Sequence, residues 1–168
     1  AKEFGYQRII TEQSPYNLLD RRIENELIPL SQRYGIGLIT WAPMAMGILA
    51  GRYKDVQKLP KDSRAYYRGG YYRERVSEAG LEVGKKFSIL AEQINLSAAQ
   101  LALLWAKDQP GVTAPLMGPR TIEHLKELLP VGEMSLDDET RTRCDELVPP
   151  GTAITDFHNT SGWMKMKI

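Results

Sequence analysis

The chain has 168 residues, enough for one domain with a substantial core, and 42% hydrophobic and 26% charged residues are typical of an ordinary globular protein. Its net charge of +1 gives no electrostatic reason to bind nucleic acid or a membrane surface. No apolar run approaches the roughly 20 residues of a membrane-spanning helix, and the N-terminus lacks a charged-then-apolar signal pattern.

The first half of the chain alternates between strand and helix patterns. Residues 9–13 form a short strand candidate, and a helix is expected over residues 20–34, ending at Gly35. The residues expected to share its apolar face are Ile23, Leu27, Leu30 and Tyr34. A second strand over Gly37–Trp41 is continuously apolar, as in a sheet covered on both faces, and Pro43 ends it.

Residues 54–72 are polar and rich in Lys, Arg, Tyr and Gly. The stretch is too long for an ordinary connection, so we expect a functional loop. Residues 74–93 form a helix pattern, and Ser97 with Gln100 forms a capping box that opens a helix over Ala98–Lys107.

The last third of the chain continues the alternation. Pro110 and Gly111 follow the helix, and residues 112–117 are a third strand candidate. Helices are expected over 121–129 and 136–147, the second opened by Ser135 and closed by prolines 149 and 150. Residues 151–168 have no clear period, and we expect an irregular tail.

This order of elements predicts an α/β fold in which parallel strands are joined by right-handed helical crossovers. Three strand–helix units can be counted, with a further helix and the tail at the C-terminus. No sequence repeat and no linker that would divide two domains is evident, so residues 1–168 are expected to form one unit.

Residues 41–47 (WAPMAMG) follow the second strand, where a parallel barrel places its active site. Trp41 can stack on a flat ring, and backbone N–H groups of a glycine-containing turn can reach phosphate oxygens. The alternative is that Trp41 belongs to the core and Gly47 to a plain turn.

Gly118-Pro119-Arg120 lies between the third strand and the next helix. A helix N-terminus and an arginine together favour an anion, and arginine can hold a phosphate with two hydrogen bonds. The alternative is an exposed arginine beside a turn glycine. Gln13 can pair with another amide or make a structural hydrogen bond, and Arg64 in the long loop can close over an anion or remain solvated.

The remaining reactive residues give weaker signals. Cys144 is the only cysteine, so an internal disulfide is excluded and a cytoplasmic location is the simplest interpretation. It falls on the apolar side of its helix, where we expect a small buried hydrophobic residue. His124 and His158 lack metal-ligand spacing, and we expect no metal site.

Three motifs occur in order: EQ-x-x-Y-N from Glu12, T-W-x-P-x-x-x-G-x-L-x-G-x-Y from Thr40, and G-x-R-x-x-x-x-L-x-E from Gly118. Together they resemble the aldo-keto reductase family, especially the branch of potassium-channel β-subunits and bacterial general reductases. The resemblance covers residues 9–147 and implies the C-terminal part of a (β/α)8 TIM barrel, around its sixth, seventh and eighth strands. The family uses NADPH to reduce aldehydes and ketones.

The resemblance implies a role for each matching position in binding NADP. Gln13 matches the residue that hydrogen-bonds the nicotinamide carboxamide, and Trp41 matches the aromatic residue that stacks on the nicotinamide ring. Arg52 and Arg64 match loop positions that clamp the cofactor. The positions that match the turn around the pyrophosphate are Ala42, Pro43, Met44, Ala45 and Gly47.

The third motif matches the family positions that bind the adenosine end of the cofactor. Gly118 and Arg120 match the site for the adenosine 2′-phosphate, and His124 and Glu127 match nearby positions that hold phosphate and adenine. His124 stands where the family usually has Gln, and Leu128 where an Asn commonly contacts adenine. Ala42 stands where Ser is frequent.

The family's Asp, Tyr, Lys and His tetrad comes from earlier strands, so no catalytic residue is assigned to this chain. Tyr16 and Tyr53 do not match the acid tyrosine. The chain begins at Ala1 without a Met, which fits a fragment or a processed chain, and a chain that truly began there would lack the acid that carbonyl reduction needs.

We therefore expect an NADP-dependent oxidoreductase of which this chain supplies the cofactor-binding part. Its expected partners are a small carbonyl substrate, the missing N-terminal part of the barrel and, in an oligomer, further copies. The alternatives are a non-catalytic nucleotide-sensing or interaction module and an inactive truncated fragment.

Overall fold

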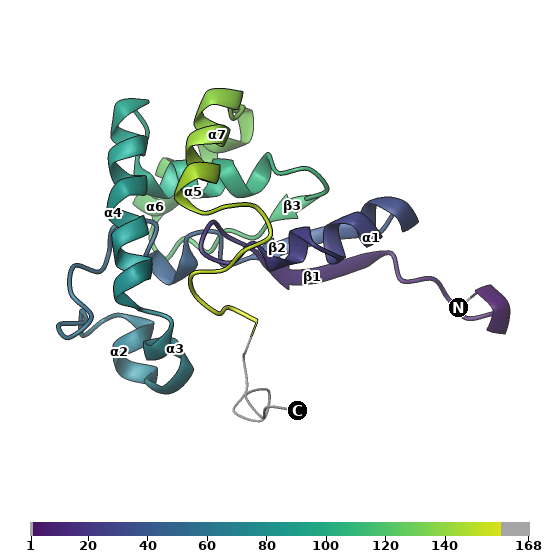
Figure 1. The fold of residues 1–168 in the computed structure, drawn as a ribbon, viewed down its shortest axis with the longest axis horizontal. Coiled ribbons are helices and arrows are strands. Elements are labelled where there is room, and N and C mark those ends of the chain that lie inside the picture. The colour runs from purple at the N-terminus through teal and green to yellow at the C-terminus, as the bar shows by residue number, and fades with distance from the viewer. Residues whose placement is uncertain (1, 159–168) are drawn as a thin grey trace.

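A computed structural model describes residues 2–158 of the chain. Three parallel strands form one sheet in the order β1-β2-β3, with β1 at Thr11–Pro15, β2 at Gly37–Trp41 and β3 at Ala114–Pro115 (Figure 1). Helices lie between successive strands, as crossover connections of a parallel sheet require. The α/β fold with three strand–helix units is therefore confirmed.

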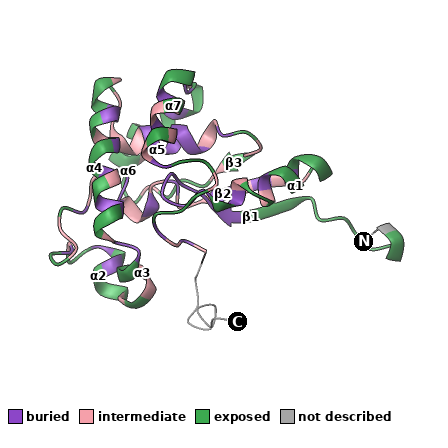
Figure 2. Ribbon diagram, in the orientation of Figure 1, coloured by how far each residue is buried: buried purple, intermediate pink, exposed green. Residues whose placement is uncertain are grey.

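Seven α-helices are found among the described residues, together with four short 3-10 helices. The α-helices are α1 (Leu27–Tyr34), α2 (Arg64–Arg68), α3 (Gly70–Glu74), α4 (Glu78–Gln93), α5 (Ala98–Lys107), α6 (Ile122–Leu128) and α7 (Asp138–Leu147). The 3-10 helices are η1 (Lys2–Phe4), η2 (Arg22–Glu24), η3 (Ala45–Gly47) and η4 (Leu129–Glu133). Residues 5–10 run away from the body of the molecule as an exposed extended stretch (Figures 1 and 2).

The two faces of the sheet differ in their cover. Leu38 and Thr40 of β2 are fully buried on the face where α1 and α5 pack, with Trp105 and other core residues. Ile39 and Trp41 alternate onto the opposite face and stay partly exposed. Among the described residues, β2 is thus fully buried on one face and half-buried on the other, so the expectation of a strand buried on both faces is met on one face only.

The region expected as one helix over residues 20–34 is divided into η2 and α1. Only the C-terminal end matches, where Gly35 adopts the left-handed conformation that ends α1. The predicted apolar face is wrong for two members, since Leu30 is 47% and Tyr34 is 58% exposed. Ile28 and Ser31 are buried instead, because α1 starts after a break and its rotation about its own axis is set by the sheet.

Several other boundaries shift for local reasons. The loop expected over 54–72 contains α2, whose N-cap Ser63 accepts a hydrogen bond from the Tyr66 N–H at 3.2 Å, and most of α3. The last helix begins after Asp137, whose carboxylate caps Thr140 N–H, and not after Ser135. The third strand is shorter than residues 112–117, since only two of its residues pair with β2.

Other sequence-based expectations are confirmed. The capping box is present, with Ser97 Oγ accepting from Gln100 N–H at 3.1 Å and Gln100 Oε1 accepting from Ser97 N–H at 3.0 Å. Cys144 is free and fully buried, and burial raises the pKa of its thiol to about 12. Among residues 2–158, no single helix is long and apolar enough to span a membrane; α4 and α5 reach that length and hydropathy only together, across a 93° bend.

Candidate functional site

The carboxyl ends of the strands lie at one edge of the sheet, because all three run in parallel. In the register, Gln13 lies beside Ile39 and Pro15 beside Trp41, so Gln13 and Trp41 project from the same, less covered face. Gln13 is exposed and Trp41 is half-buried. The amide of Gln13, in the middle of β1, and the indole of Trp41, the last residue of β2, are therefore diagonal neighbours on one face of the sheet.

The turn after β2 is strained. Ala42, Ala45 and Met46 all have positive φ angles, of 59°, 48° and 59°, which non-glycine residues rarely adopt. The turn closes on itself, with the Ala45 N–H donating to the Ala42 carbonyl at 2.9 Å and the Gly47 N–H to the Met44 carbonyl at 2.8 Å. Such clusters of backbone strain occur at ligand clamps and active sites.

Two of the predicted cofactor arginines converge on one carboxylate. Arg52 Nη2 donates to Asp62 Oδ2 at 2.7 Å, and Arg120 Nη2 lies 3.9 Å from the same oxygen. The hydrogen bond from Arg52 holds the pKa of Asp62 below its usual range. Arg52 also lies against the strained turn, since a Cβ on Gly47 would be 3.1 Å from Arg52 Cδ. The ion pair between Asp62 and Arg120 thus joins the loops after β2 and β3.

Neither the backbone angle nor any contact among the described residues requires a glycine at position 118. Its φ angle is not positive, and a Cβ built there would meet nothing within 4 Å. Glycine in such a place permits close approach of a ligand to the backbone. The neighbouring Arg120 is 59% exposed on its side chain, which is paired at 3.9 Å with the exposed Asp62 carboxylate.

The other predicted residues are placed less favourably. Arg64 begins α2, two residues after Asp62, and its exposed guanidinium lies 5.8 Å from the centre of the Tyr72 ring. Glu127 Oε1 accepts a hydrogen bond from Ser97 Oγ at 2.6 Å, which ties it to the start of α5. His124 is exposed on α6.

Neither nearby tyrosine is positioned as a proton donor for a ligand. Tyr16 is buried and its hydroxyl donates to Glu24 at 2.6 Å, and burial followed by the Glu24 charge raises its pKa strongly. Tyr53 is buried with its hydroxyl 3.3 Å from the Met46 carbonyl. Both hydroxyls serve the fold.

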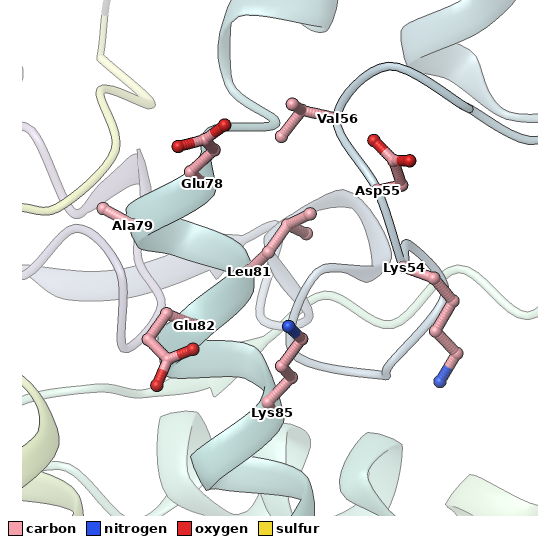
Figure 3. A pocket seen from close by; sticks show the side chains of 8 residues that line it. All are labelled: Lys54, Asp55, Val56, Glu78, Ala79, Leu81, Glu82 and Lys85. Carbon is pink, nitrogen blue, oxygen red and sulfur yellow. The ribbon is translucent and has the colours of Figure 1, made fainter.

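One surface hollow lies away from these residues. It has a volume of about 490 Å³ and lies between the loop after β2 and α4, and its walls are Lys54, Asp55, Val56, Glu78, Ala79, Leu81, Glu82 and Lys85 (Figure 3). Acidic and basic side chains alternate around it, and none of the predicted cofactor residues lines it. We therefore place the candidate site at the strand ends, on the geometry of the turn and arginines.

Sequence reasoning missed two features of this site. The positive φ angles at Ala42, Ala45 and Met46 carry no sequence signal, because glycine or asparagine is the usual mark of that conformation. Asp62 was also missed, although a carboxylate inside the basic stretch 54–72 is the one signal that could have indicated an internal partner for the arginines.

The sequence matches known proteins along most of its length. The sequence profile of the Aldo/keto reductase family matches residues 1–149. The chain belongs to the aldo-keto reductase family. It is 32% identical over 152 residues to "Uncharacterized oxidoreductase YrpG" of Bacillus subtilis (strain 168), covering 90% of this chain and 44% of that protein. It is 35% identical over 127 residues to "Probable voltage-gated potassium channel subunit beta" of Oryza sativa subsp. japonica, covering 71% and 38%.

A solved structure gives the same relationship for the fold. The glycerol dehydrogenase AKR11B4 from Gluconobacter oxydans superposes with a TM-score of 0.68 and 26% identity, covering 87% of this chain and 45% of that one. The three parallel strands and their helices are thus the C-terminal part of the aldo-keto reductase (β/α)8 barrel, as the motifs predicted. The chain spans less than half of the length of these relatives.

Proposed function

We propose that the protein is an NADPH-dependent reductase of aldehydes or ketones, and that this chain supplies its cofactor-binding part. The observation that carries the proposal is the strained turn at the end of β2, directly after the half-buried Trp41. A turn that stores strain beside an accessible indole is costly for folding alone and is what a ligand clamp requires. Membership of a family of reductases supports the same conclusion.

The residues present fit a dinucleotide. When bound, NADPH supplies the hydride for carbonyl reduction. In this proposal Trp41 stacks on the nicotinamide and Gln13 pairs with its carboxamide, while the turn after β2 and Arg52 hold the pyrophosphate. Gly118 gives the ligand access to the backbone after β3, and Arg120 supplies the positive partner of the 2′-phosphate.

The acid that protonates the carbonyl oxygen is proposed to come from strands outside this chain, because Tyr16 and Tyr53 are engaged elsewhere. The test is NADPH oxidation, followed by absorbance against a panel of small aldehydes and ketones. We expect no turnover from residues 1–168 alone and turnover once the preceding barrel strands are present. Turnover by the 168-residue chain, lost on mutating a residue within it, would overturn this division of labour.

A second candidate function is nucleotide sensing without turnover. It is favoured by the similarity to a protein named as a probable potassium channel β-subunit. Tight NADPH binding by the full-length protein with no oxidation of any carbonyl in the panel would select this alternative. The free, buried Cys144 is consistent with a cytoplasmic location for either function, which we also propose.

A further inference from the structure

Arg75 follows α3 directly and is 4% exposed, although it carries a full charge. Its Nε donates to the carbonyl of Asp156 at 3.1 Å, and its Nη2 donates to the carbonyl of Phe157 at 2.9 Å. The guanidinium also lies 5.0 Å from the Tyr71 ring centre and 4.9 Å from that of Phe157. One side chain thus binds the backbone and a ring of the C-terminal segment.

The same guanidinium reaches the proposed cofactor site. Its Nη1 lies 4.0 Å from the Sδ of Met46, which is one of the strained residues in the turn after β2. The Met46 carbonyl is contacted in turn by the Tyr53 hydroxyl at 3.3 Å. Arg75 therefore touches the turn and the C-terminal segment at once, although the two are more than a hundred residues apart in the sequence.

Residues 151–158, here called the C-terminal strap, are fixed on their other side by the segment after β1. The Arg21 N–H donates to the Thr152 carbonyl at 2.8 Å, and the Ile154 N–H donates to the Leu19 carbonyl at 2.8 Å. Near its end, the Phe157 N–H donates to Asp20 Oδ2 at 2.8 Å.

The strap closes over the core with a fully buried ring, that of Phe157. It runs across the body of the molecule from α7 toward α3 (Figure 1). Its path therefore ends beside Arg75, so the side chain that fixes its end is also the one that reaches the turn after β2.

Arginine suits this position better than any other cation. Its planar fork can donate to two carbonyls while both faces lie against aromatic rings. Burial lowers the pKa of Arg75, yet an arginine remains charged in proteins, so the desolvation cost is not relieved by losing a proton. We interpret the desolvation cost of the buried guanidinium as the cost of contacts that fix the relative position of the strap and the turn.

We propose that Arg75 is a positioning residue that couples the turn after β2 to docking of the C-terminal strap. The turn then holds its strained conformation only while the strap is in place. This inference rests on the proposed function for its consequence, which is that the affinity for the cofactor depends on the strap.

Hydrogen exchange measured by mass spectrometry on the full-length protein without ligand tests the coupling. In Arg75→Met we expect peptides from both the turn and the strap to exchange roughly tenfold faster, the scale of losing charge-assisted hydrogen bonds. Phe157→Ala, which removes the buried strap ring that lies against the Arg75 guanidinium, should accelerate the turn as well. Arg75→Lys should restore part of the protection, since one ammonium cannot serve both carbonyls and Met46.

Arg68→Gln is the matched control, because Arg68 is an exposed arginine 5.8 Å from the Tyr72 ring centre, and it should change neither peptide. Should Arg75→Met fail to fold, Asp20→Asn loosens the strap from its other side and should also accelerate the turn. Faster exchange of the strap with an unchanged turn in Phe157→Ala and Asp20→Asn would overturn the proposal.

Cofactor titrations separate this inference from the proposed function. Arg75→Met and Phe157→Ala should weaken NADPH and NADH by the same factor, because the turn contacts the part that both share. Wild-type protein that binds neither cofactor would refute the proposed function, while the exchange data would still decide the coupling. Wild-type binding that Arg75→Met leaves unchanged would refute the role of Arg75 in cofactor binding and leave the proposed function standing.

Discussion

Arg120 is the residue on which cofactor choice is expected to depend. NADPH differs from NADH by the 2′-phosphate, and an arginine after β3 can pair with it. Charge-assisted hydrogen bonds contribute roughly 1.5–3 kcal/mol, or about ten- to a hundredfold in affinity. Because the Arg120 side chain is 59% exposed, solvent screening places the expected loss near the lower end, at about tenfold.

Arg120→Ala in the full-length protein should therefore weaken NADPH binding about tenfold and leave NADH nearly unchanged. Fluorescence titrations with both cofactors measure this. Equal losses for NADPH and NADH would mean that Arg120 holds the loop and does not distinguish the phosphate. Arg52→Ala is the comparison, since Arg52 lies against the turn and should affect both cofactors.

At the residue scale, the sequence placed Trp41 and Arg120 correctly relative to the strands, since Trp41 ends β2 and Arg120 lies in the segment after β3. Gln13 was expected at the end of the first strand and lies in its middle. The strain at Ala42 and Met46 was not predictable, because it results from how the chain must turn at that point and leaves no mark in the residue types. These site assignments stay predictions until a cofactor is titrated.

Helix α4 packs against the turn region through a glycine. Gly84 lies in the middle of α4, and a Cβ there would be 2.7 Å from the Ile48 carbonyl oxygen. Alanine is the better helix former by about 1 kcal/mol, so helix propensity alone predicts stabilisation. The contact is with backbone, which cannot move aside cheaply, and overpacking of this kind costs about 1–3 kcal/mol.

Gly84→Ala should thus lower the free energy of unfolding by up to about 2 kcal/mol, which is the overpacking cost less the gain in helix propensity. Urea denaturation followed by circular dichroism measures the change. Gly132→Ala is the control, because a Cβ at Gly132 meets nothing within 4 Å and its φ is not positive. A stabilised Gly84→Ala variant would show that α4 and the segment at Ile48 are not in close contact.

At the element scale, locally encoded features were the ones predicted correctly. The capping box at Ser97 and Gln100 lies within four residues and specifies the start of α5 by itself. The break between η2 and α1 has no local signal. There the Asn25 side chain donates to the Gly151 carbonyl and Glu24 accepts from the Gly151 N–H, so contacts across more than a hundred residues accompany the break.

The Asp20 carboxylate, which holds the C-terminal strap, makes the stability of the whole molecule depend on pH. Burial raises the pKa of Asp20, but hydrogen bonds from Arg22, His158 and the Phe157 N–H outweigh burial and hold that pKa below its usual range. A carboxyl whose pKa is lowered by folding contributes stability above its unfolded pKa, near 4, and loses it as the pH falls through the folded value.

Wild-type protein should therefore lose stability below about pH 4, and Asp20→Asn should lose less over the same interval. Urea unfolding at several pH values between neutral and acid measures both. Asp55→Asn is the control, because Asp55 lies in a loop outside the strap and its carboxylate accepts a local hydrogen bond from the Gln57 N–H. Parallel curves for wild type and Asp20→Asn would contradict a linkage through Asp20.

The sheet of the 168-residue chain leaves both of its outer strands unpaired on one side among the described residues, since β1 and β3 each pair only with β2. Exposed apolar side chains adjoin these edges: Ile9 and Ile10 precede β1, and Leu116 and Met117 follow β3. A (β/α)8 barrel covers such edges by closure, whereas an open parallel sheet offers them to other chains. The isolated chain should therefore self-associate.

Sedimentation velocity at increasing protein concentration measures this self-association. A double variant, Ile9→Lys with Leu116→Lys, should shift the distribution toward monomer because charge blocks edge pairing. Leu129→Lys, at an equally exposed position in η4 outside the sheet, should not. A compact, stable monomer of the unmodified 168-residue chain at all concentrations would show that three strands suffice without the rest of the barrel.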